Sequence, residues 1–132
     1  MINSNSISIN LPVFNSETTV LLCLKSILEQ NFPIKEIIMV DNHSTDKTIQ
    51  VIENFMKKNK KIPMRLIKRD KSYRVADSYN LAAQLAKSKY IVLMHSDCML
   101  PTEHELKKLM MPFMKDPSID LSAPYVVLPK YI

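Results

Sequence analysis

The feature that most constrains the fold is a strict alternation of short apolar runs with longer segments of helical spacing. Runs rich in β-branched residues are typical of strands, and apolar positions three or four residues apart are typical of helices that bury one face. The pattern predicts strands at 6–11, 36–40, 64–68, 90–94 and 121–128. It predicts helices at 17–30, 45–58, 75–87 and 102–115.

This alternation predicts the α/β class with three layers, α/β/α. Strand, helix and strand in succession require right-handed crossovers, which give a mostly parallel central sheet covered by helices on both faces. The runs 36–40 and 90–94 are nearly continuously apolar, as strands buried on both faces are. With 46% apolar residues, a chain of 132 residues can form one core and is too short for two ordinary domains. We therefore predict a single domain over 1–132.

Polar residues mark where the predicted helices begin. Ser16 and Ser44 are predicted N-caps, and Thr102 with Glu105 is predicted to form a capping box. Pro112 is predicted to kink or end the last helix, because proline has no backbone N–H to donate.

The chain contains no glycine, whereas average usage would give roughly nine. Turns that require a positive φ must therefore use Asn, Asp or strained residues. The absence also excludes the dinucleotide fingerprint and the Walker loop, since both need glycine where the backbone approaches phosphate. A bound nucleotide must be held in another way.

The net charge of +5 favours anionic partners. Much of the excess lies in Lys57, Lys58, Lys60 and Lys61, at the end of a predicted helix, where cations suit both the helix dipole and water. The basic residues are not interleaved with aromatic ones in a stacking platform, so nucleic acid is not an expected partner.

Cysteine content and hydropathy bear on location. Cys23 and Cys98 are the only cysteines, so no disulfide framework is implied. No signal-peptide pattern precedes the first strand, and no run of eighteen apolar residues occurs. We expect a cytoplasmic protein with at most peripheral membrane contact.

Polar residues follow three of the predicted strands, at 12–17, 41–46 and 95–97. Because ligands of an open parallel sheet bind beyond the carboxyl ends of its strands, Asn15, Asp41 and Asp97 are predicted to share one ligand edge. Asp41 either accepts hydrogen bonds from a base or ribose or forms a turn. Asp46, in the first turn of a helix, is interpreted as a partner of the helix dipole.

His95 and Asp97 are two positions apart, which on extended backbone directs both side chains to the same side. Imidazole with carboxylate suits Mn²⁺, whereas Mg²⁺ prefers oxygen ligands throughout. The alternative is that His95 is a hydrogen-bonded structural residue.

Together these blocks resemble the nucleotide-binding half of family 2 glycosyltransferases, which have the GT-A, nucleotide-diphospho-sugar transferase-like fold. The matching blocks are 7–15 with Glu17, 24–30, 36–48 and 90–97, and they cover nearly the whole chain. The resemblance implies a UDP- or GDP-type nucleotide sugar as ligand and a divalent metal, Mn²⁺ or Mg²⁺, as cofactor. The nucleotide-binding residues that it implies are Pro12, Phe14, Asn15, Glu17, Asp41, Asn42, Arg74 and Ser96. The metal ligands that it implies are Asp97, the last aspartate of the D-x-D signature, and His95.

The chain departs from the family pattern at several positions. Asn42 replaces the second aspartate of an Asp-Asp pair, His43 and Arg74 replace glycines, His95 replaces the first D-x-D aspartate, and Tyr79 replaces an arginine. Each change weakens the expectation of nucleotide or metal binding. Arg74 either reaches the diphosphate or is an ordinary surface arginine.

Family members continue into an acceptor-binding region that supplies the catalytic base, and this chain ends at Ile132. We therefore assign no base, and interpret Asp116 and Asp120 as part of the turn before the last strand. Three hypotheses follow. The chain is a minimal or truncated glycosyltransferase, which a partner chain or dimer could complete; a nucleotide-binding module without turnover; or an assembly module with a degenerate ligand edge.

Overall fold

The computed structural model describes residues 6–124. Its strands are β1 (Ile7–Val13), β2 (Ile34–Asp41), β3 (Met64–Lys68) and β4 (Tyr90–Leu93), and its helices are α1 (Val20–Leu28), α2 (Thr48–Lys58), α3 (Val75–Leu85) and α4 (Glu105–Lys115). The four helices and the first four strands are therefore the predicted ones, but most of them begin or end a few residues from the predicted positions. Of the strand predicted at 121–128, residues 121–124 have no regular structure, and the remainder lies outside the described residues.

The four strands form one parallel sheet in the order β3-β2-β1-β4. β1 is central and pairs with β2 along its whole length, from Ile7 opposite Ile34 to Val13 opposite Asp41. The carboxyl ends of β1 and β2 therefore lie side by side, which places the loops that follow them at one edge. The prediction of a mostly parallel central sheet is confirmed.

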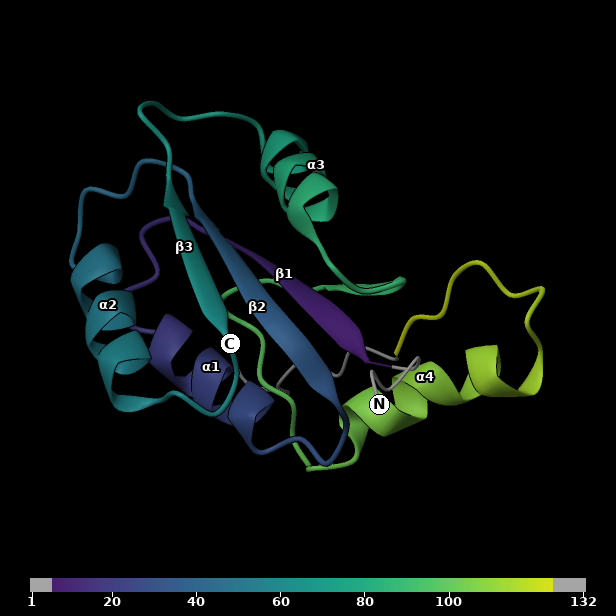
Figure 1. The fold of residues 1–132 in the computed structure, drawn as a ribbon. Coiled ribbons are helices and arrows are strands. Elements are labelled where there is room, and N and C mark those ends of the chain that lie inside the picture. The colour runs from purple at the N-terminus through teal and green to yellow at the C-terminus, as the bar shows by residue number, and fades with distance from the viewer. Residues whose placement is uncertain (1–5, 125–132) are drawn as a thin grey trace, which may run out of the picture.

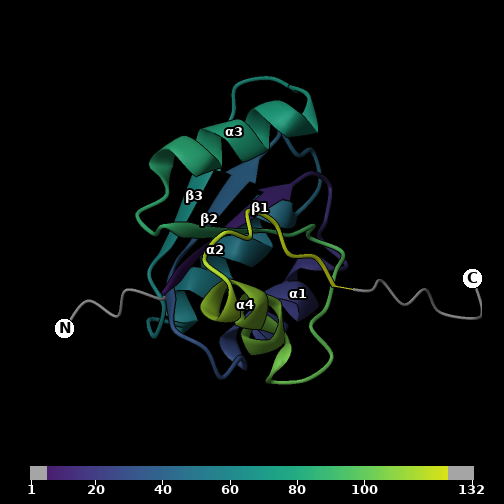
Figure 2. The same cartoon turned by 90° about the vertical axis from the view of Figure 1, so that its right-hand side faces the viewer.

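Helices cover both faces of the sheet, as Figures 1 and 2 show. On one face, α1, α2 and α4 pack against alternate residues of β1, including Ile9 and Leu11, in the main core. On the other face, α3 packs through Ala82 against Ile38 and Val40 of β2. Because successive side chains of a strand point to opposite faces, a buried strand contributes side chains to the core on both faces of the sheet. The α/β/α arrangement is confirmed.

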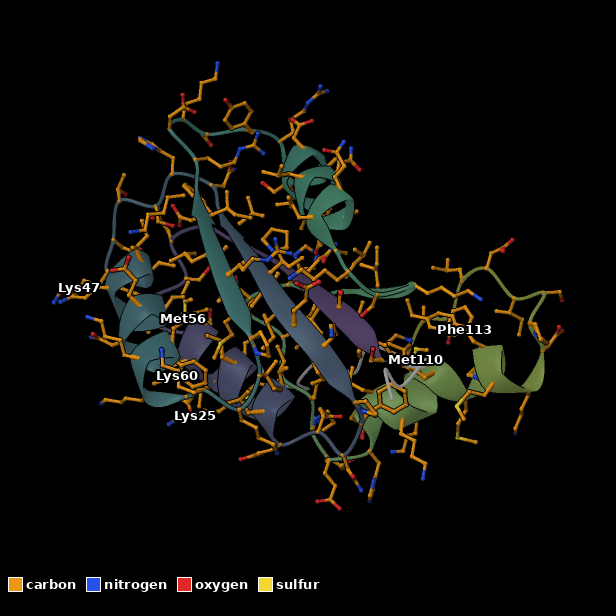
Figure 3. All side chains as sticks on the ribbon, in the orientation of Figure 1. Lys25, Lys47, Met56, Lys60, Met110 and Phe113 are labelled. Atoms are coloured by element: carbon orange, nitrogen blue, oxygen red, sulfur yellow. The ribbon has the colours of Figure 1, made fainter. Side chains whose placement is uncertain are left out.

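The helix α4 joins the main core through Leu106 and Met110, and Figure 3 shows Met110 and Phe113 on this helix. The ring of Phe113 packs on that of Tyr90 with centroids 5.3 Å apart. Pro112 lies inside α4, and the helix continues to Lys115. Pro112 was predicted to kink or end the helix, and of these the end is wrong. Burial of Leu106 and Met110 stabilises the helix, although proline cannot donate one of its backbone hydrogen bonds.

Both predicted serine caps are wrong. α1 begins after Thr19 and α2 after Lys47, and neither residue caps with its side chain. Ser16 instead donates to the carbonyl of Phe14, and the Ser44 hydroxyl accepts the N–H of Asn15 at 2.9 Å. Both serines serve contacts between loops, which the sequence around each helix start does not reveal.

At α4 the reciprocal capping box is replaced by a side-chain pair. The Thr102 hydroxyl donates to the Glu105 carboxylate, and His104 takes the N-cap position. No helix within residues 6–124 has the length and apolar content that crossing a bilayer would require.

Candidate functional site

A hollow of about 440 Å³ opens at the carboxyl ends of β1 and β4. The residues that line it come from the loops after β1, β2 and β4 and from the first turn of α3. They are Pro12, Val13, Phe14, Asn15, Ser16, Thr18, Thr19, Asn42, Val75, Ser78, His95, Ser96 and Asp97. The predicted convergence of three strand-end loops is therefore present.

Most of the predicted site residues line this hollow, namely Pro12, Phe14, Asn15, Asn42, His95, Ser96 and Asp97. Glu17, Asp41 and Arg74 do not. A larger groove of about 550 Å³ lies between α1 and α2, but it is lined by residues such as Lys25, Phe55 and Lys58 and by none of the predicted ones. The smaller hollow is the candidate site because the polar strand ends converge there.

Asn15 joins the first loop to the second. Its backbone has φ 43°, in the left-handed region, and its N–H donates to the Ser44 hydroxyl. Its side-chain Oδ1 accepts the N–H of Thr45 at 2.9 Å. Asn tolerates this conformation better than most residues because its short polar side chain bonds locally. The prediction that Asn takes over a glycine-like turn is confirmed here, and His43, with φ 67°, is a second such residue.

Ser16 joins the first loop to the loop after β4. Its hydroxyl lies 2.7 Å from that of Ser96, and its N–H donates to the Thr48 hydroxyl at 2.7 Å. Ser16 is buried, so these bonds are shielded from competing water. The loop that carries Asp97 is thereby anchored to β1 and to the start of α2.

Glu17 and Asp46 support the loops reciprocally. The N–H of Glu17 donates to Asp46 Oδ2 at 3.2 Å, and the N–H of Lys47 donates to Glu17 Oε2 at 3.0 Å. Asp46 Oδ1 also accepts the N–H of Thr48 at 2.9 Å. Burial acts to raise the pKa of Asp46, but the hydrogen bonds from Thr48 and Glu17 outweigh it and lower that pKa. The Glu17 carboxylate faces the start of α2 and not the hollow.

Asp41 ends β2 and is 1% exposed. Its Oδ2 accepts the N–H of Ser44 at 3.1 Å, whereas its Oδ1 is buried and has no hydrogen-bond partner among the described residues. A buried carboxylate oxygen without a donor is costly. One oxygen of the Asp41 carboxylate therefore stabilises the turn, and the other is an acceptor without a donor.

Asn42, the next residue, is paired through both of its amide atoms. Nδ2 donates to the carbonyl of Tyr73 at 2.6 Å, and Oδ1 accepts the N–H of Tyr73 at 2.7 Å. The guanidinium carbon of Arg69 lies 3.6 Å from the centroid of the Tyr73 ring. Asn42 therefore fixes the segment that leads from β3 into α3.

His95 and Asp97 lie in a turn, closed by the N–H of Cys98 donating to the carbonyl of His95 at 3.1 Å. The expectation that extended backbone directs both side chains to one side is wrong, because the strand ends at Leu93. Both residues nevertheless line the hollow. In the described part of the chain no group of three or more His, Cys, Asp or Glu side chains is placed to hold a metal.

Tyr79, on α3, supports His95. Their rings meet edge to face with centroids 5.9 Å apart. Burial raises the pKa of Tyr79, and the charges of Cys98 and Asp97 add to this. In the sequence this position is only a departure from the family pattern, because the contact between a helix residue and a strand-end loop depends on the three-dimensional fold.

Arg74 lies at the surface, where its side chain is 91% exposed and its Nε is 3.8 Å from Asp77. Sequence reasoning missed Ser78, which is fully buried, lines the hollow and has a hydroxyl without a partner in the described residues. The sequence around a serine within a helix does not indicate that its side chain lines a hollow. Only the packing of α3 against β1 and β2 reveals it.

Comparisons with known proteins agree with this geometry. A sequence model described as "Glycosyl transferase family 2" matches residues 8–129. Glycosyltransferase GlyG of Streptococcus pneumoniae is 30% identical over 94 residues, which cover 71% of this chain and 31% of that protein. The chain thus spans about a third of the length of this relative.

Two solved structures share the fold. S. aureus TarS in complex with UDP superposes with a TM-score of 0.70 at 22% identity, over 83% of this chain and 32% of that one. Mannosyltransferase PcManGT from Pyrobaculum calidifontis, in complex with GDP-Man and Mn²⁺, superposes with a TM-score of 0.80 at 21% identity, over 86% and 33%. The expected GT-A fold is confirmed. With its strand-end loops arranged in this fold and matched along most of its length, the chain belongs to glycosyl transferase family 2.

Proposed function

We propose that this chain binds a nucleotide sugar of UDP or GDP type in the hollow and acts as the donor-binding domain of a glycosyltransferase. The observation that carries the proposal is the hollow that three strand-end loops enclose at the carboxyl ends of the strands. Asp41 does not line it, but it precedes Asn42, which does, and its buried Oδ1 is unsatisfied, so a ligand would reach this oxygen only if the loop after β2 moved. An N–H of a base or a ribose hydroxyl would satisfy that oxygen. TarS with UDP and PcManGT with GDP-Man support this class of ligand.

The proposed nucleotide contacts fall into two groups. Pro12, Phe14, Asn15, Asn42 and Ser96 line the hollow and would contact the nucleotide directly. Glu17 would act indirectly, since its carboxylate orders the start of α2. Arg74, at the exposed start of α3, would have to turn toward the hollow to reach the diphosphate.

Asp97 with His95 would hold a divalent cation. One carboxylate with one imidazole fits Mn²⁺ better than Mg²⁺, and the remaining ligands would be diphosphate oxygens and water. The chemistry supplied by the bound cation is neutralisation of the charge that develops on the diphosphate leaving group. Tyr79 orients the imidazole of His95, and the Ser16–Ser96 contact fixes the turn that carries Asp97. PcManGT, solved with Mn²⁺, supports this assignment.

Calorimetry tests the binding proposal. UDP and GDP are titrated into the protein with Mn²⁺ or with a chelator, and we expect affinity that depends on the metal. Asp97→Ala should abolish the dependence on Mn²⁺. Asp41→Asn keeps an acceptor for Ser44 but presents a donor in place of Oδ1, and should weaken binding by about 1–3 kcal/mol with or without metal.

The matched control is Asp120→Ala, which removes an exposed carboxylate outside the hollow and should leave both affinities unchanged. Equal affinity of the parent protein and Asp97→Ala for UDP with Mn²⁺ would remove Asp97 from the metal site. No binding of UDP or GDP at millimolar concentration would reject the proposal and favour an assembly module.

Binding does not require that the domain catalyse sugar transfer. The second candidate function is therefore a nucleotide-binding module without catalytic turnover. Departures from the family pattern at Asn42 and His95, which line the hollow, and at Arg74 and Tyr79, on α3 and at its start, favour it. Release of UDP from UDP-GlcNAc or of GDP from GDP-mannose, abolished by Asp97→Ala, would support the enzyme. Binding without release over a long incubation would support the module.

Residues 1–132 are proposed as a single donor-binding domain. A partner chain or a second copy is proposed to contribute to the acceptor site. No residue of this chain is proposed as the catalytic base. The cytoplasmic location and the peripheral character of any membrane contact remain predictions from the sequence.

A further inference from the structure

The groove of about 550 Å³ between α1 and α2 takes no part in the proposed nucleotide site. The apolar residues that line it are buried or partly buried, namely Leu21, Leu28, Val51 and Phe55. Lys25 of α1 and Lys58 of α2, both exposed, line it from its two sides. Leu22, the neighbour of Leu21 on α1, is 52% exposed. An apolar depression therefore lies between two exposed cations and beside an exposed leucine.

The same part of the surface is strongly basic. Lys60 and Lys61, both exposed, come directly after α2. With Lys25 and Lys58 they bring four positive charges to the groove and its end, and Glu29, which also lines the groove, offsets one. Figure 3 shows Lys25 and Lys60 on the side of the molecule that α1 and α2 form. This excess of positive charge is a large part of the net charge of +5.

We propose that this surface docks on an anionic lipid membrane. The basic groove face, as we call it, consists of the groove, Leu22 and the four lysines Lys25, Lys58, Lys60 and Lys61. The ammonium groups would lie against lipid phosphates, while Leu22 and the apolar part of the groove would contact the boundary of the acyl chains. The inference goes beyond the proposed sugar-nucleotide binding and does not depend on it.

The chemistry of the side chains favours a lipid surface over an acidic protein segment. All four cations of the basic groove face are lysines, which present a point charge on a flexible stem. Arginine, with its planar fork, is better suited to a carboxylate held at one position. A fluid layer of phosphates requires no such fixed geometry. The exposed Leu22 and the apolar groove add contact with hydrocarbon, which a polyphosphate chain such as nucleic acid does not offer.

Docking through the basic groove face would leave the nucleotide hollow open. Helices α1 and α2 each lead from the carboxyl end of one strand to the amino end of the next. Their C-terminal ends, where Glu29 and Lys58 lie, are therefore at the amino end of the parallel sheet. The hollow lies at the opposite end, beyond the carboxyl ends of β1 and β4. A chain docked in this way would remain accessible to a donor in solution.

Cosedimentation of the full chain with vesicles tests the docking. Vesicles of equimolar phosphatidylglycerol and phosphatidylcholine should bind the protein, and vesicles of phosphatidylcholine alone should not. Added salt should weaken the binding because it screens the charges. No binding to the anionic vesicles at low salt, or equal binding to both kinds, overturns the proposal. Binding to soluble polyglutamate but not to anionic vesicles also overturns it, and would assign the groove to an acidic protein.

Variants of the basic groove face test where the membrane is contacted. Lys25→Gln, Lys58→Gln and Lys60→Gln together should lower binding to the anionic vesicles about a hundredfold, since each lysine near such a surface contributes roughly fivefold. Leu22→Ser keeps every charge and should lower binding about tenfold, because it removes apolar contact with the acyl-chain boundary. Binding of Leu22→Ser equal to that of the parent protein overturns the proposal.

The matched control removes the same number of charges from the other side of the sheet. Lys71→Gln, Lys87→Gln and Lys89→Gln change three exposed lysines in the connections that flank α3, and this triple variant should retain most of the binding. If both triple variants lose binding equally, net charge alone is responsible and the basic groove face is overturned. Circular dichroism checks that both variants are folded. If the first is not, the parent protein on the two kinds of vesicle and Leu22→Ser still decide the proposal.

Discussion

At the residue scale, Asn42 shows how a departure from the family pattern is used. An aspartate at this position could accept from the Tyr73 N–H, but its ionised carboxylate could not donate to the Tyr73 carbonyl. Asn42 does both, at 2.7 and 2.6 Å. The amide thus replaces a negative charge at the rim of the hollow with two hydrogen bonds that hold the segment before α3.

The variant Asn42→Asp should therefore be less stable. It loses the donor to Tyr73 and turns a carboxylate toward that carbonyl oxygen, so we expect the free energy of unfolding to fall by about 1–3 kcal/mol. Urea denaturation at neutral pH, followed by circular dichroism, measures this. Asn31→Asp, which adds the same charge at an exposed position, is the control and should change little. Equal stability of the two variants would contradict the role of the Tyr73 pair.

His43 occupies a position where the family has glycine, and its φ is 67°. A residue with a β-carbon pays about 1–2 kcal/mol in this conformation, of which the greater freedom of an unfolded glycine cancels part. We expect His43→Gly to raise the free energy of unfolding by about 0.5–1 kcal/mol. His43→Ala keeps the β-carbon and should give no such gain. If alanine stabilises as much as glycine, backbone strain is not the cause.

These residues also show what the sequence predicts at this scale. The absence of glycine predicted that Asn or strained residues would take positive φ, and Asn15 and His43 do so. The partner of Asn42, by contrast, lies 31 positions away, and that of Asn15 lies 30 away. Such pairs depend on how two loops meet, and no local pattern encodes them.

At the scale of elements, Glu36 ties together the end of the sheet opposite the hollow. Its carboxylate accepts from the Ser8 hydroxyl at 2.8 Å, from the Lys87 N–H at 2.7 Å and from the Arg65 guanidinium at 2.9 Å. These partners belong to β1, to the connection from α3 to β4, and to β3. A charged residue that is 3% exposed within an apolar strand is thereby satisfied.

The same network predicts a dependence of stability on pH. Burial acts to raise the pKa of Glu36, but the bonds from Lys87, Ser8 and Arg65 outweigh it, so the folded pKa lies below the ordinary 4.5. Its stabilisation is complete above that ordinary value and is lost as pH falls through the lower folded pKa. Glu36→Gln should cost about 1–3 kcal/mol at pH 7, and less at a pH below the folded pKa.

Urea denaturation of both proteins across this acidic range gives the comparison, because other carboxylates titrate alike in each. Glu29→Gln is the control, since Glu29 is an exposed carboxylate at the end of α1. A difference between parent and Glu36→Gln that stays constant from pH 7 to the acidic end would contradict the assignment.

The existence and order of the elements could be predicted because apolar periodicity is a local property of each segment. Element ends were predicted less well. Ser16 and Ser44 have the residue type of N-caps but are used in bonds between loops, and His95 and Asp97 fall in a turn because β4 stops at Leu93. Tertiary contacts override local preference where strands end, and those ends form the candidate site.

At the scale of the whole molecule, the hollow is built from segments that only the folded chain brings together. The loops after β1, β2 and β4 are joined through Asn15 and Ser16. Asn42 ties the loop after β2 to the segment before α3, and α3 closes one side of the hollow with Val75 and Ser78. A ligand that needs these loops together binds the folded chain and not the unfolded one. Ligand binding and global unfolding are therefore linked.

Thermal unfolding should report this linkage. With Mn²⁺ fixed, each tenfold rise in free UDP above its dissociation constant should add about 1.4 kcal/mol to the free energy of unfolding, so the midpoint should climb without reaching a plateau. The same titration with GDP shows which of the two bases the site prefers, because the tighter ligand raises the midpoint at a lower concentration. Asp41→Asn should need a higher UDP concentration for the same rise, because it loses the acceptor at Oδ1. If neither UDP nor GDP raised the midpoint temperature of unfolding, the loops would enclose no nucleotide site. A rise that is identical for Asp41→Asn and the parent protein would show that the nucleotide binds without that carboxylate.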